Sequence, residues 1–495
     1  MQLEYVNAKN ESLTCTYNGI YLHSSYNPQS ESSRFAETLN IDFIPSNIIV
    51  IEPALSYCIK DLKQKFPETK IYSIRFIKDI KPASGELSPE KDFFFENEIK
   101  LKTELYNYFG EENLLNTFFV SWPASIKVFP QENEKVWSVI KELLKDCQSI
   151  LATRQFFAEC WIKNQIKFFL KLKKTRTVNK IDVPVLICAS GPGLKRCMPA
   201  IKRIQDNFFI IACSSAIKTL LYNKIKPDLC ISTDGGFWAK KHLYCLLQEN
   251  IPLAVTPEAA VPEKLFDKEM VVLLYDDAFE KAVLDKNNSG PDKIKYLNAK
   301  QNGTISGTAA ELALLLTDKN IYAAGLDLES GKGFSHTQPN ELELNSSIKD
   351  FKLKNTDTRT FAQSLESRSL EMYRNWFSEN SSKFNERFFR VYSEKPYRHK
   401  LGSIKDIDIK ELEAQKNIKK NYFSDAVQTT LKKDEITDFY NKLLLDDGFI
   451  KNYFPADSIA IYRTKDERKK QELKAQLEKK LNKIKAFIKR QEEKK

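Results

Sequence analysis

Three short apolar runs, each followed by a small polar or glycine-containing turn, constrain the fold of this 495-residue chain most. They lie at residues 185–189, 208–213 and 228–232. Continuous apolar runs are typical of strands that are buried on both faces of a parallel sheet. We therefore expect an α/β domain with an open, mostly parallel sheet. Because ligands bind beyond the carboxyl ends of such strands, the three turns should share one rim.

Two later segments add to this predicted rim. Residues 302–308, Asn-Gly-Thr-Ile-Ser-Gly-Thr, lead into a helical pattern at 309–316. A further apolar strand at 321–324 is followed by Gly-Leu-Asp-Leu-Glu at 325–329. Five segments are thus expected to meet at one edge of the sheet.

The turn Ser190-Gly191-Pro192-Gly193 has the composition of an anion site. Its glycines leave main-chain amides uncovered, and the helix that follows adds its dipole. Ser306-Gly307-Thr308 repeats the pattern at a second helix start, with a hydroxyl residue in a capping position. Each motif alone also fits an ordinary turn or helix cap. Together on one rim they favour a nucleotide-type phosphate site.

His336 is the histidine best placed for catalysis, because it lies in a Gly/Ser-rich loop after the strand at 321–324. An imidazole there can act as the base that removes a proton from an acceptor hydroxyl. A plain surface histidine is the alternative. His23, His242 and His399 are expected to be structural or solvent-facing.

Asp327 and Glu329 form the pair of acids at the end of this strand. Paired carboxylates can hold a divalent metal against a diphosphate. An acid at a strand end more often caps a loop or binds a ribose hydroxyl, and we favour that interpretation. No other group of Cys, His and acidic residues has the spacing of metal ligands, so we expect no metal.

Four regions are predicted from the changes in pattern. Residues 1–90 read as a small α/β domain, with strands at 47–52 and 70–74. The turn after its first strand lacks the glycine that a pyrophosphate requires, so we expect a structural role. Residues 91–180 read as a helical connector, 181–345 as the catalytic domain, and 346–495 as helical and polar.

The charge of the chain is concentrated at its end. Of the formal net charge of +11, a surplus of seven lies within residues 465–495. Five aliphatic residues there recur every three or four positions, which predicts one apolar face of a long helix: Leu473, Leu477, Leu481, Ile484 and Ile488. We expect this helix to pack on its own domain or against a second copy, with docking onto an acidic partner as the alternative.

Several classes of protein are disfavoured by composition. The chain has no run of about eighteen apolar residues that could span a bilayer, and its first residues lack the features of a secretory signal. Nine cysteines are scattered without a C-x-x-C pair, and Cys188, Cys213 and Cys230 lie inside apolar runs. We expect buried thiols, a cytoplasmic location, and no nucleic-acid or membrane partner.

The ordered set of motifs resembles the Maf (motility accessory factor) flagellin glycosyltransferases. In the centre, the resemblance rests on residues 190–194, 211–221, 225–229, 232–234, 303–309, 324–328 and 335–337. Residues 19–28 and 34–36 look like the amino-terminal domain of that family, and 371–377 with 391–412 look like its carboxy-terminal extension. The similarity thus covers most of the chain. The central domain is also similar to bacterial sialyltransferases and to an archaeal pterin diphosphokinase-like domain.

This resemblance implies a Rossmann-like catalytic domain that transfers a nonulosonic acid of the pseudaminic or legionaminic type. The donor would be its CMP derivative, the acceptors Ser or Thr hydroxyls of flagellin, and the reaction inverting and metal-free. The implied catalytic residues are His336 as base, with Asp327 and Glu329 beside it. Where the related sialyltransferases have tyrosines that support the leaving phosphate, this chain has Glu329 and Phe334, so Tyr373 or Tyr397 is a candidate for that role. The residues implied to hold the donor nucleotide are Ser190, Gly191, Pro192, Gly193, Ser214, Ser215, Thr233, Asp234, Thr304, Ser306, Gly307 and Thr308.

Two alternatives stay open. One is a metal-dependent pterin diphosphokinase with its metal at Asp327 or Glu329. The other is a flagellin-binding chaperone without catalysis. The retained helix-start turns and His336 favour the transferase.

Overall fold

The chain forms two compact units, each assembled from segments that are distant in the sequence. The computed structural model describes residues 3–275, 278–287, 294–329, 331–348, 350–353, 355, 360–361, 365–384, 386–413, 416, 418–429 and 431–493. The first unit comprises Met1–Ala158 and Leu445–Lys483, and the second comprises Glu159–Leu444 and Ile484–Lys495.

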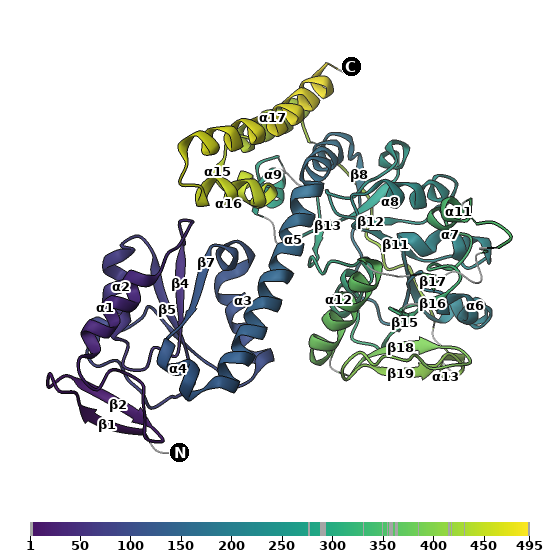
Figure 1. Cartoon of the computed structure of the whole chain (residues 1–495). Coiled ribbons are helices and arrows are strands. Elements are labelled where there is room, and N and C mark those ends of the chain that lie inside the picture. The colour runs from purple at the N-terminus through teal and green to yellow at the C-terminus, as the bar shows by residue number, and fades with distance from the viewer. Residues whose placement is uncertain are drawn as a thin grey trace. The chain divides into compact units, whose positions relative to one another are not determined.

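The first unit is an α/β structure with two sheets. Its strands are β1 Leu3–Asn7, β2 Leu13–Tyr17, β3 Ile20–Tyr21, β4 Asn47–Ile51, β5 Lys70–Arg75, β6 Asp92–Phe94 and β7 Thr117–Ser121. Its helices are α1 Pro28–Thr38, α2 Tyr57–Lys65, η1 Gly85–Leu87, α3 Glu98–Leu115, α4 Pro123–Val128, α15 Asp447–Tyr453 and α16 Pro455–Arg463, with the first part of α5 Pro130–Lys171 and most of α17 Glu467–Glu492. Strands β1–β3 form an antiparallel sheet, and β6-β5-β4-β7 form a parallel one (Figure 1).

The parallel sheet of this unit is covered on both faces because the side chains of β4 alternate. Ile49 and Ile51 pack with residues of α3 and α5, whereas Ile48 and Val50 pack with residues of α1 and α2. Strand β7 corrects our prediction of a helical connector at residues 91–180. Its sequence, Thr-Phe-Phe-Val-Ser, is short and aromatic, and pairing with the central strand β4 decides its conformation.

The turn after β4 is closed by buried charges. Glu52, Ala54 and Ser56 have positive φ angles of 44°, 47° and 66°, and all three are fully buried. Oε2 of Glu52 accepts a hydrogen bond of 2.6 Å from the amide of Phe76. Arg75 donates to the Ala54 carbonyl at 2.8 Å and to the Ser56 hydroxyl at 2.6 Å. Since these atoms are used internally, the turn offers no exposed amide to a ligand.

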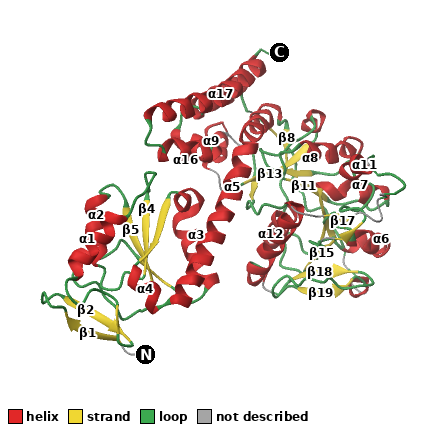
Figure 2. Ribbon diagram, viewed as in Figure 1, coloured by secondary structure: helices red, strands yellow, loops and turns green. Residues whose placement is uncertain are grey.

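The second unit contains the large sheet, several strands of which are labelled in Figure 2. Its strand order is β19-β18-β15-β9-β10-β11-β12-β13-β8-β20, with β14 beside β13. All pairings are parallel except β20 with β8. The strands are β8 Lys174–Thr175, β9 Val185–Cys188, β10 Phe209–Cys213, β11 Leu229–Ser232, β12 Leu253–Val255, β13 Glu269–Leu274, β14 Tyr296–Asn298, β15 Ile321–Ala324, β18 Phe388–Tyr392, β19 Lys405–Asp408 and β20 Val427–Gln428. β16 Gly331–Lys332 and β17 Thr360–Phe361 form a separate antiparallel pair.

Helices cover both faces of this sheet. They are α6 Gly193–Ile204, η2 Gln205–Asn207, α7 Ser214–Tyr222, α8 Phe237–His242, η3 Leu243–Gln248, η4 Glu263–Asp267, α9 Ala278–Asn287, α10 Ile305–Leu316, α11 Glu341–Ser347, α12 Leu365–Glu379, η5 Ser381–Phe384, α13 Lys410–Glu413 and α14 Lys433–Leu443. The apolar side of α10 packs against the face that carries Val185, Ile187 and Ile211. The sheet, the smaller N-terminal α/β unit and the helices from α14 onward confirm the predicted fold class.

Strands β18 and β19 correct the expectation that residues 346–495 are helical throughout. β18 has the sequence Phe-Phe-Arg-Val-Tyr, in which Arg390 interrupts the apolar run. Arg390 is fully buried and pairs with Asp406 of β19 at 2.7 Å. Arg390 therefore made this strand difficult to recognise from the sequence, because the acid that pairs with it lies on the neighbouring strand.

Two further predictions are met. Cys188, Cys213 and Cys230 are free and buried. Of the five aliphatic residues predicted to form the apolar face of α17, Leu477, Leu481, Ile484 and Ile488 are buried, whereas Leu473 is half-buried. Among the described residues, no helix has both the length and the apolar character that a bilayer crossing requires.

The buried charges at the end of β4 give a stability prediction. Arg75→Met leaves Glu52 and Asp92 without the guanidinium in a buried site, which should lower the free energy of unfolding of the first unit by about 3–5 kcal/mol. Urea unfolding of the full chain measures the change. Lys78→Met is the control, because its ion pair with Glu96 is exposed and should contribute less than about 1 kcal/mol. Equal effects of the two substitutions would contradict a stabilising role for the buried cluster.

Candidate functional site

The candidate site lies at the carboxyl edge of the large sheet, where the strand order changes direction. Strand β9 lies between β10, which follows it in the chain, and β15, which comes much later. Such a switch point is the usual ligand site of open parallel sheets. Here the turns in question are residues 189–193 after β9 and residues 325–327 after β15.

Glycine is required in these two turns because they approach each other closely. A Cβ at Gly191 would lie 2.2 Å from Oδ2 of Asp327 and 2.5 Å from the carbonyl oxygen of Gly325. A Cβ at Gly325, whose φ is +73°, would lie 2.3 Å from the carbonyl oxygen of Ala189. The backbone amide of Gly191 donates to the Gly325 carbonyl at 2.9 Å. The glycines therefore permit contact between two strands' turns.

The start of α6 is bound by a carboxylate of the protein. The amide of Gly193 donates to Oδ1 of Asp327 at 2.7 Å, so the helix dipole acts on this acid. We predicted these amides as part of a phosphate cradle, and a phosphate that used them would have to displace Asp327. The assignment of residues 190–193 to the donor nucleotide stays a prediction.

Asp327 has an unusual protonation equilibrium. Burial raises its pKa to about 6, the hydrogen bond from Gly193 opposes this shift, and the charge of Glu329 adds to it. In the described part of the chain, its Oδ2 is buried without a hydrogen-bond partner. This carboxyl group therefore exchanges its proton near neutral pH.

Glu329 faces a different part of the backbone. Its Oε1 accepts hydrogen bonds from the amides of Arg398 at 2.6 Å and His399 at 3.2 Å. The two acids thus bind separate segments, Asp327 at α6 and Glu329 after β18. Within the described ranges, no group of three or more His, Cys, Asp or Glu side chains is arranged to hold a metal ion.

The ends of β10 and β11 supply hydroxyl groups. Ser215 donates to the Ser190 hydroxyl at 2.8 Å, which joins the second turn to the first. Ser214, the first residue of α7, and Ser232, the last of β11, are buried, and neither hydroxyl has a hydrogen-bond partner among the described residues. Asp234 is exposed and accepts from the amide of Gly236 at 2.7 Å. The hydroxyls of Ser214 and Ser232 therefore retain unused hydrogen-bonding capacity.

The loop that carries His336 is tied to the same edge by Thr337. The amide of Thr337 donates to the Ser190 carbonyl at 2.8 Å, and its hydroxyl donates to the Gly191 carbonyl at 2.5 Å. Thr219 of α7 in turn donates to the Thr337 carbonyl at 3.0 Å. The structure thus brings the predicted base and the first turn together.

His336 is held by a buried acid that the sequence analysis missed. Its Nδ1 lies 3.1 Å from Oε1 of Glu343, which also accepts from the amide of His336 at 3.0 Å and from the hydroxyl of Ser335. Burial would raise the pKa of Glu343, but the hydrogen bonds from His336 and Ser335 outweigh it and lower the pKa. An imidazole bound at Nδ1 by a carboxylate presents Nε2 as the basic nitrogen. The acid-rich helix start at residues 341–343 was the available signal.

The same short helix, α11, fixes a second histidine. Glu341 lies 2.6 Å from Nδ1 of His242 and 3.0 Å from Nζ of Lys218. These two interactions lower the pKa of Glu341 against the effect of its burial, which alone would raise it. His242 is buried, in agreement with the structural role expected for it. His23 is also buried, in the first unit, where burial lowers its pKa.

The start of α10 forms a second group on this edge. Thr304 precedes the helix, and its hydroxyl is 2.9 Å from that of Ser306. The hydroxyl of Thr308 donates to the Lys300 carbonyl at 3.1 Å, and a Cβ at Gly307 would lie 3.1 Å from the ring of Trp376. Ser306 and Gly307 thus contact their own turn and α12.

Tyr373 and Tyr397, the two candidates for supporting the leaving phosphate, lie in different surroundings. Tyr373 lies beside Gly303, 3.9 Å from where a Cβ would be, and burial followed by the charge of Asp234 raises its pKa. Tyr397 donates its hydroxyl to the Val391 carbonyl at 2.9 Å, and burial raises its pKa strongly. Tyr373 therefore links the turn after β11 to the start of α10, whereas Tyr397 is engaged on the backbone.

Comparison with known proteins locates this site within a recognised type of domain. Residues 159–333 match the family model described as "MptE-like: 6-hydroxymethylpterin diphosphokinase MptE-like". A Maf glycosyltransferase from Magnetospirillum magneticum AMB-1 has a similar structure, with a TM-score of 0.59 and 11% identity over 99% of this chain and 91% of that one. The fold is therefore that of a Maf glycosyltransferase along nearly the whole chain.

One relative was found by sequence. A protein of Treponema pallidum (strain Nichols), described as "Uncharacterized protein", is 34% identical over 280 residues. The match covers 56% of this chain and 60% of that protein, so it spans less than two thirds of the relative's length.

The raised pKa of Asp327 gives a prediction with a definite sign. An acid whose pKa rises on folding stabilises the protein below its unfolded pKa, near 3.8, and this stabilisation is lost as the pH rises through about 6. Relative to Asp327→Asn, the wild-type chain should lose up to about 3 kcal/mol of unfolding free energy between pH 4 and pH 7. Urea unfolding at several pH values measures this. The control is Asp438→Asn at an exposed position, and parallel curves for wild type and Asp327→Asn would contradict the prediction.

Proposed function

We propose that this chain is a glycosyltransferase of the Maf kind, which transfers a nonulosonic acid of the pseudaminic or legionaminic type from its CMP donor to Ser or Thr of flagellin. The likeness of fold along nearly the whole chain supports this proposal. The observation that carries it is the pair His336–Glu343 beside the first turn of the sheet, since it has the form of a general base held by a carboxylate.

The proposed reaction uses the described groups as follows. Nε2 of His336 takes the proton of the acceptor hydroxyl while the oxygen forms a bond to the anomeric carbon of the sugar. The bond from that carbon to the phosphate oxygen breaks, and CMP leaves with the electron pair. Attack from the side opposite the leaving group inverts the anomeric centre.

The leaving phosphate needs hydrogen-bond donors at its developing charge. We propose the start of α7 as the principal donor, because the Ser214 hydroxyl is buried there without a partner among the described residues. We propose the starts of α6 and α10, with Gly193 and Ser306, as secondary donors to the phosphate. Asp327 occupies the amide of Gly193, and Ser306 bonds to Thr304.

A pterin diphosphokinase is the second candidate, because the family model that matches residues 159–333 carries that description. The matched segment ends before His336 and Glu343. Such an enzyme would use a divalent metal, for which this chain offers Oδ2 of Asp327, while Glu329 is bound to two amides. The third candidate is a flagellin-binding chaperone without turnover.

One assay distinguishes the three candidates. The full chain is incubated with CMP-nonulosonic acid and flagellin, with and without EDTA, and glycosylated flagellin is measured by mass spectrometry. We expect transfer that survives the chelator. Diphosphate transfer to 6-hydroxymethylpterin that EDTA abolishes would replace the proposal by the second candidate. Flagellin binding with no turnover of either substrate would replace it by the third.

The role of His336 and its acid is tested by substitution. His336→Ala should lower kcat by about 10²–10⁴-fold, with donor binding retained, because general-base catalysis contributes that much. Glu343→Gln should lower kcat by about 10–100-fold with little change in KM, because the imidazole loses its orienting carboxylate.

Glu341→Gln is the matched control, since it lies in the same helix and removes the same kind of bond from His242. Its kcat should stay close to that of the wild type. A loss in Glu341→Gln as large as that in Glu343→Gln would show that α11 acts only by its stability, and that His336 is not the base.

A further inference from the structure

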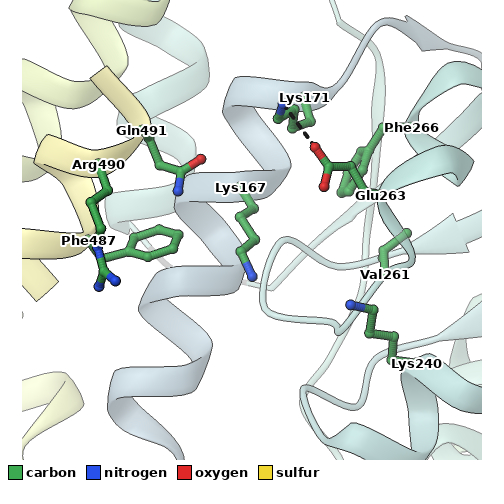
Figure 3. Close-up of a pocket in the computed structure, with 9 residues that line it drawn as sticks. All are labelled: Lys167, Lys171, Lys240, Val261, Glu263, Phe266, Phe487, Arg490 and Gln491. Carbon is green, nitrogen blue, oxygen red and sulfur yellow. Dashed lines mark ion pairs between the residues drawn. The ribbon is translucent and has the colours of Figure 1, made fainter. Parts of the chain in front are cut away.

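A basic pocket in the second unit lies outside the residues assigned to the donor and acceptor. It has a volume of about 290 Å³ and is lined by nine residues: Lys167, Lys171, Lys240, Val261, Glu263, Phe266, Phe487, Arg490 and Gln491. They come from the end of α5, from α8, from the segment at residues 261–266 and from the end of α17 (Figure 3). Four elements distant in the sequence thus converge on one concavity.

The charges around this pocket are not balanced. Lys171 pairs with Glu263 at 3.1 Å, and Glu263 is the only acid in the lining. Among the described residues, Lys167, Lys240 and Arg490 form no ion pair with a carboxylate. The pocket is therefore lined by three cations in addition to Lys171, and its single acid, Glu263, is paired with Lys171.

Lys167 shows the energetic consequence of this arrangement. Figure 3 shows its side chain and that of Lys240 extending into the same space from α5 and α8. Burial and the charge of Lys240 lower the pKa of Lys167. Its ammonium lies 5.5 Å from the centre of the Phe487 ring, which compensates only weakly. A bound anion would remove this repulsion.

Neutral contacts in the pocket suit a compact ligand. Phe266 is buried and Phe487 half-buried, so the wall is partly apolar. Gln491 is 8% exposed, and its side chain lines the pocket. An amide group and several ammonium groups around about 290 Å³ match a small phosphorylated compound in size and in donor chemistry.

We propose that this pocket binds a small, multiply charged phosphate compound, the size of pyrophosphate or a sugar phosphate. Lys167, Lys240 and Arg490 supply the charge, and Gln491 supplies a neutral hydrogen bond. The site is distinct from the turns at Ser190, Ser214 and His336, and it does not rest on the proposed transferase activity.

The test uses the full chain, inorganic pyrophosphate as the probe and isothermal titration calorimetry at low salt. We expect one pyrophosphate per chain, with affinity that falls as salt is added. Lys167→Met and Lys240→Met should each weaken it by about tenfold or more, since each removes a charged hydrogen bond. Lys173→Met is the matched control, because this residue is exposed, pairs with Asp267 and lies outside the lining.

Two further measurements keep the result unambiguous. Thermal unfolding without ligand should show Lys167→Met and Lys240→Met at least as stable as wild type, because each removes a like-charge contact. Binding should persist in saturating CMP. Unchanged affinity in both pocket variants, or displacement of pyrophosphate by CMP, would overturn the proposal. Equal binding of citrate and pyrophosphate would overturn the assignment to phosphate.

Discussion

The contact between the turns after β9 and β15 is the constraint on which the candidate site depends. Gly191 and Gly325 have no room for a Cβ, and the carboxylate of Asp327 fills the space that remains beside Gly191 and Gly193. If either turn were displaced, the carbonyls of Ser190 and Gly191 would no longer receive Thr337. The position of His336 thus follows from backbone packing several residues away.

This constraint is polar as well as steric. A carboxylate at the start of α6 satisfies the positive end of a helix dipole, yet its burial makes the charged form costly. Asp327 is therefore poised between two protonation states at the point where two strands meet. Glu341 and Glu343 differ from Asp327 because each is paired with the imidazole of a histidine, His242 and His336 respectively, whereas Asp327 accepts a hydrogen bond from a backbone amide.

The sequence was most informative where local pattern and final environment agree. The runs that became β9, β10, β11 and β15 are apolar throughout and buried on both faces, so they could be identified without tertiary information. The order of short motifs along the chain also predicted the Maf-like fold, which the structural comparison confirms. His336 was recognisable as a loop histidine near the rim, and its loop lies there.

Prediction from the sequence failed where the local structure depends on a residue that is distant in the sequence. β18 contains Arg390, which is acceptable in a buried strand only because Asp406 lies on the adjacent strand. Glu343 cannot be paired with His336 from spacing alone, since the turn between them determines whether they meet. The contact of Asp327 with the amide of Gly193 was likewise not predictable, because the sequence shows that an amide is uncovered but not which side chain approaches it. The assignment of this turn to the donor nucleotide stays a prediction.

The discontinuous composition of the two units has a consequence for biosynthesis. Residues 445–483 belong to the first unit, and 484–495 belong to the second, so neither unit can be completed before these residues are synthesised. Before then the first unit lacks α15, α16 and most of α17. Neither unit is therefore built from one continuous stretch of the chain.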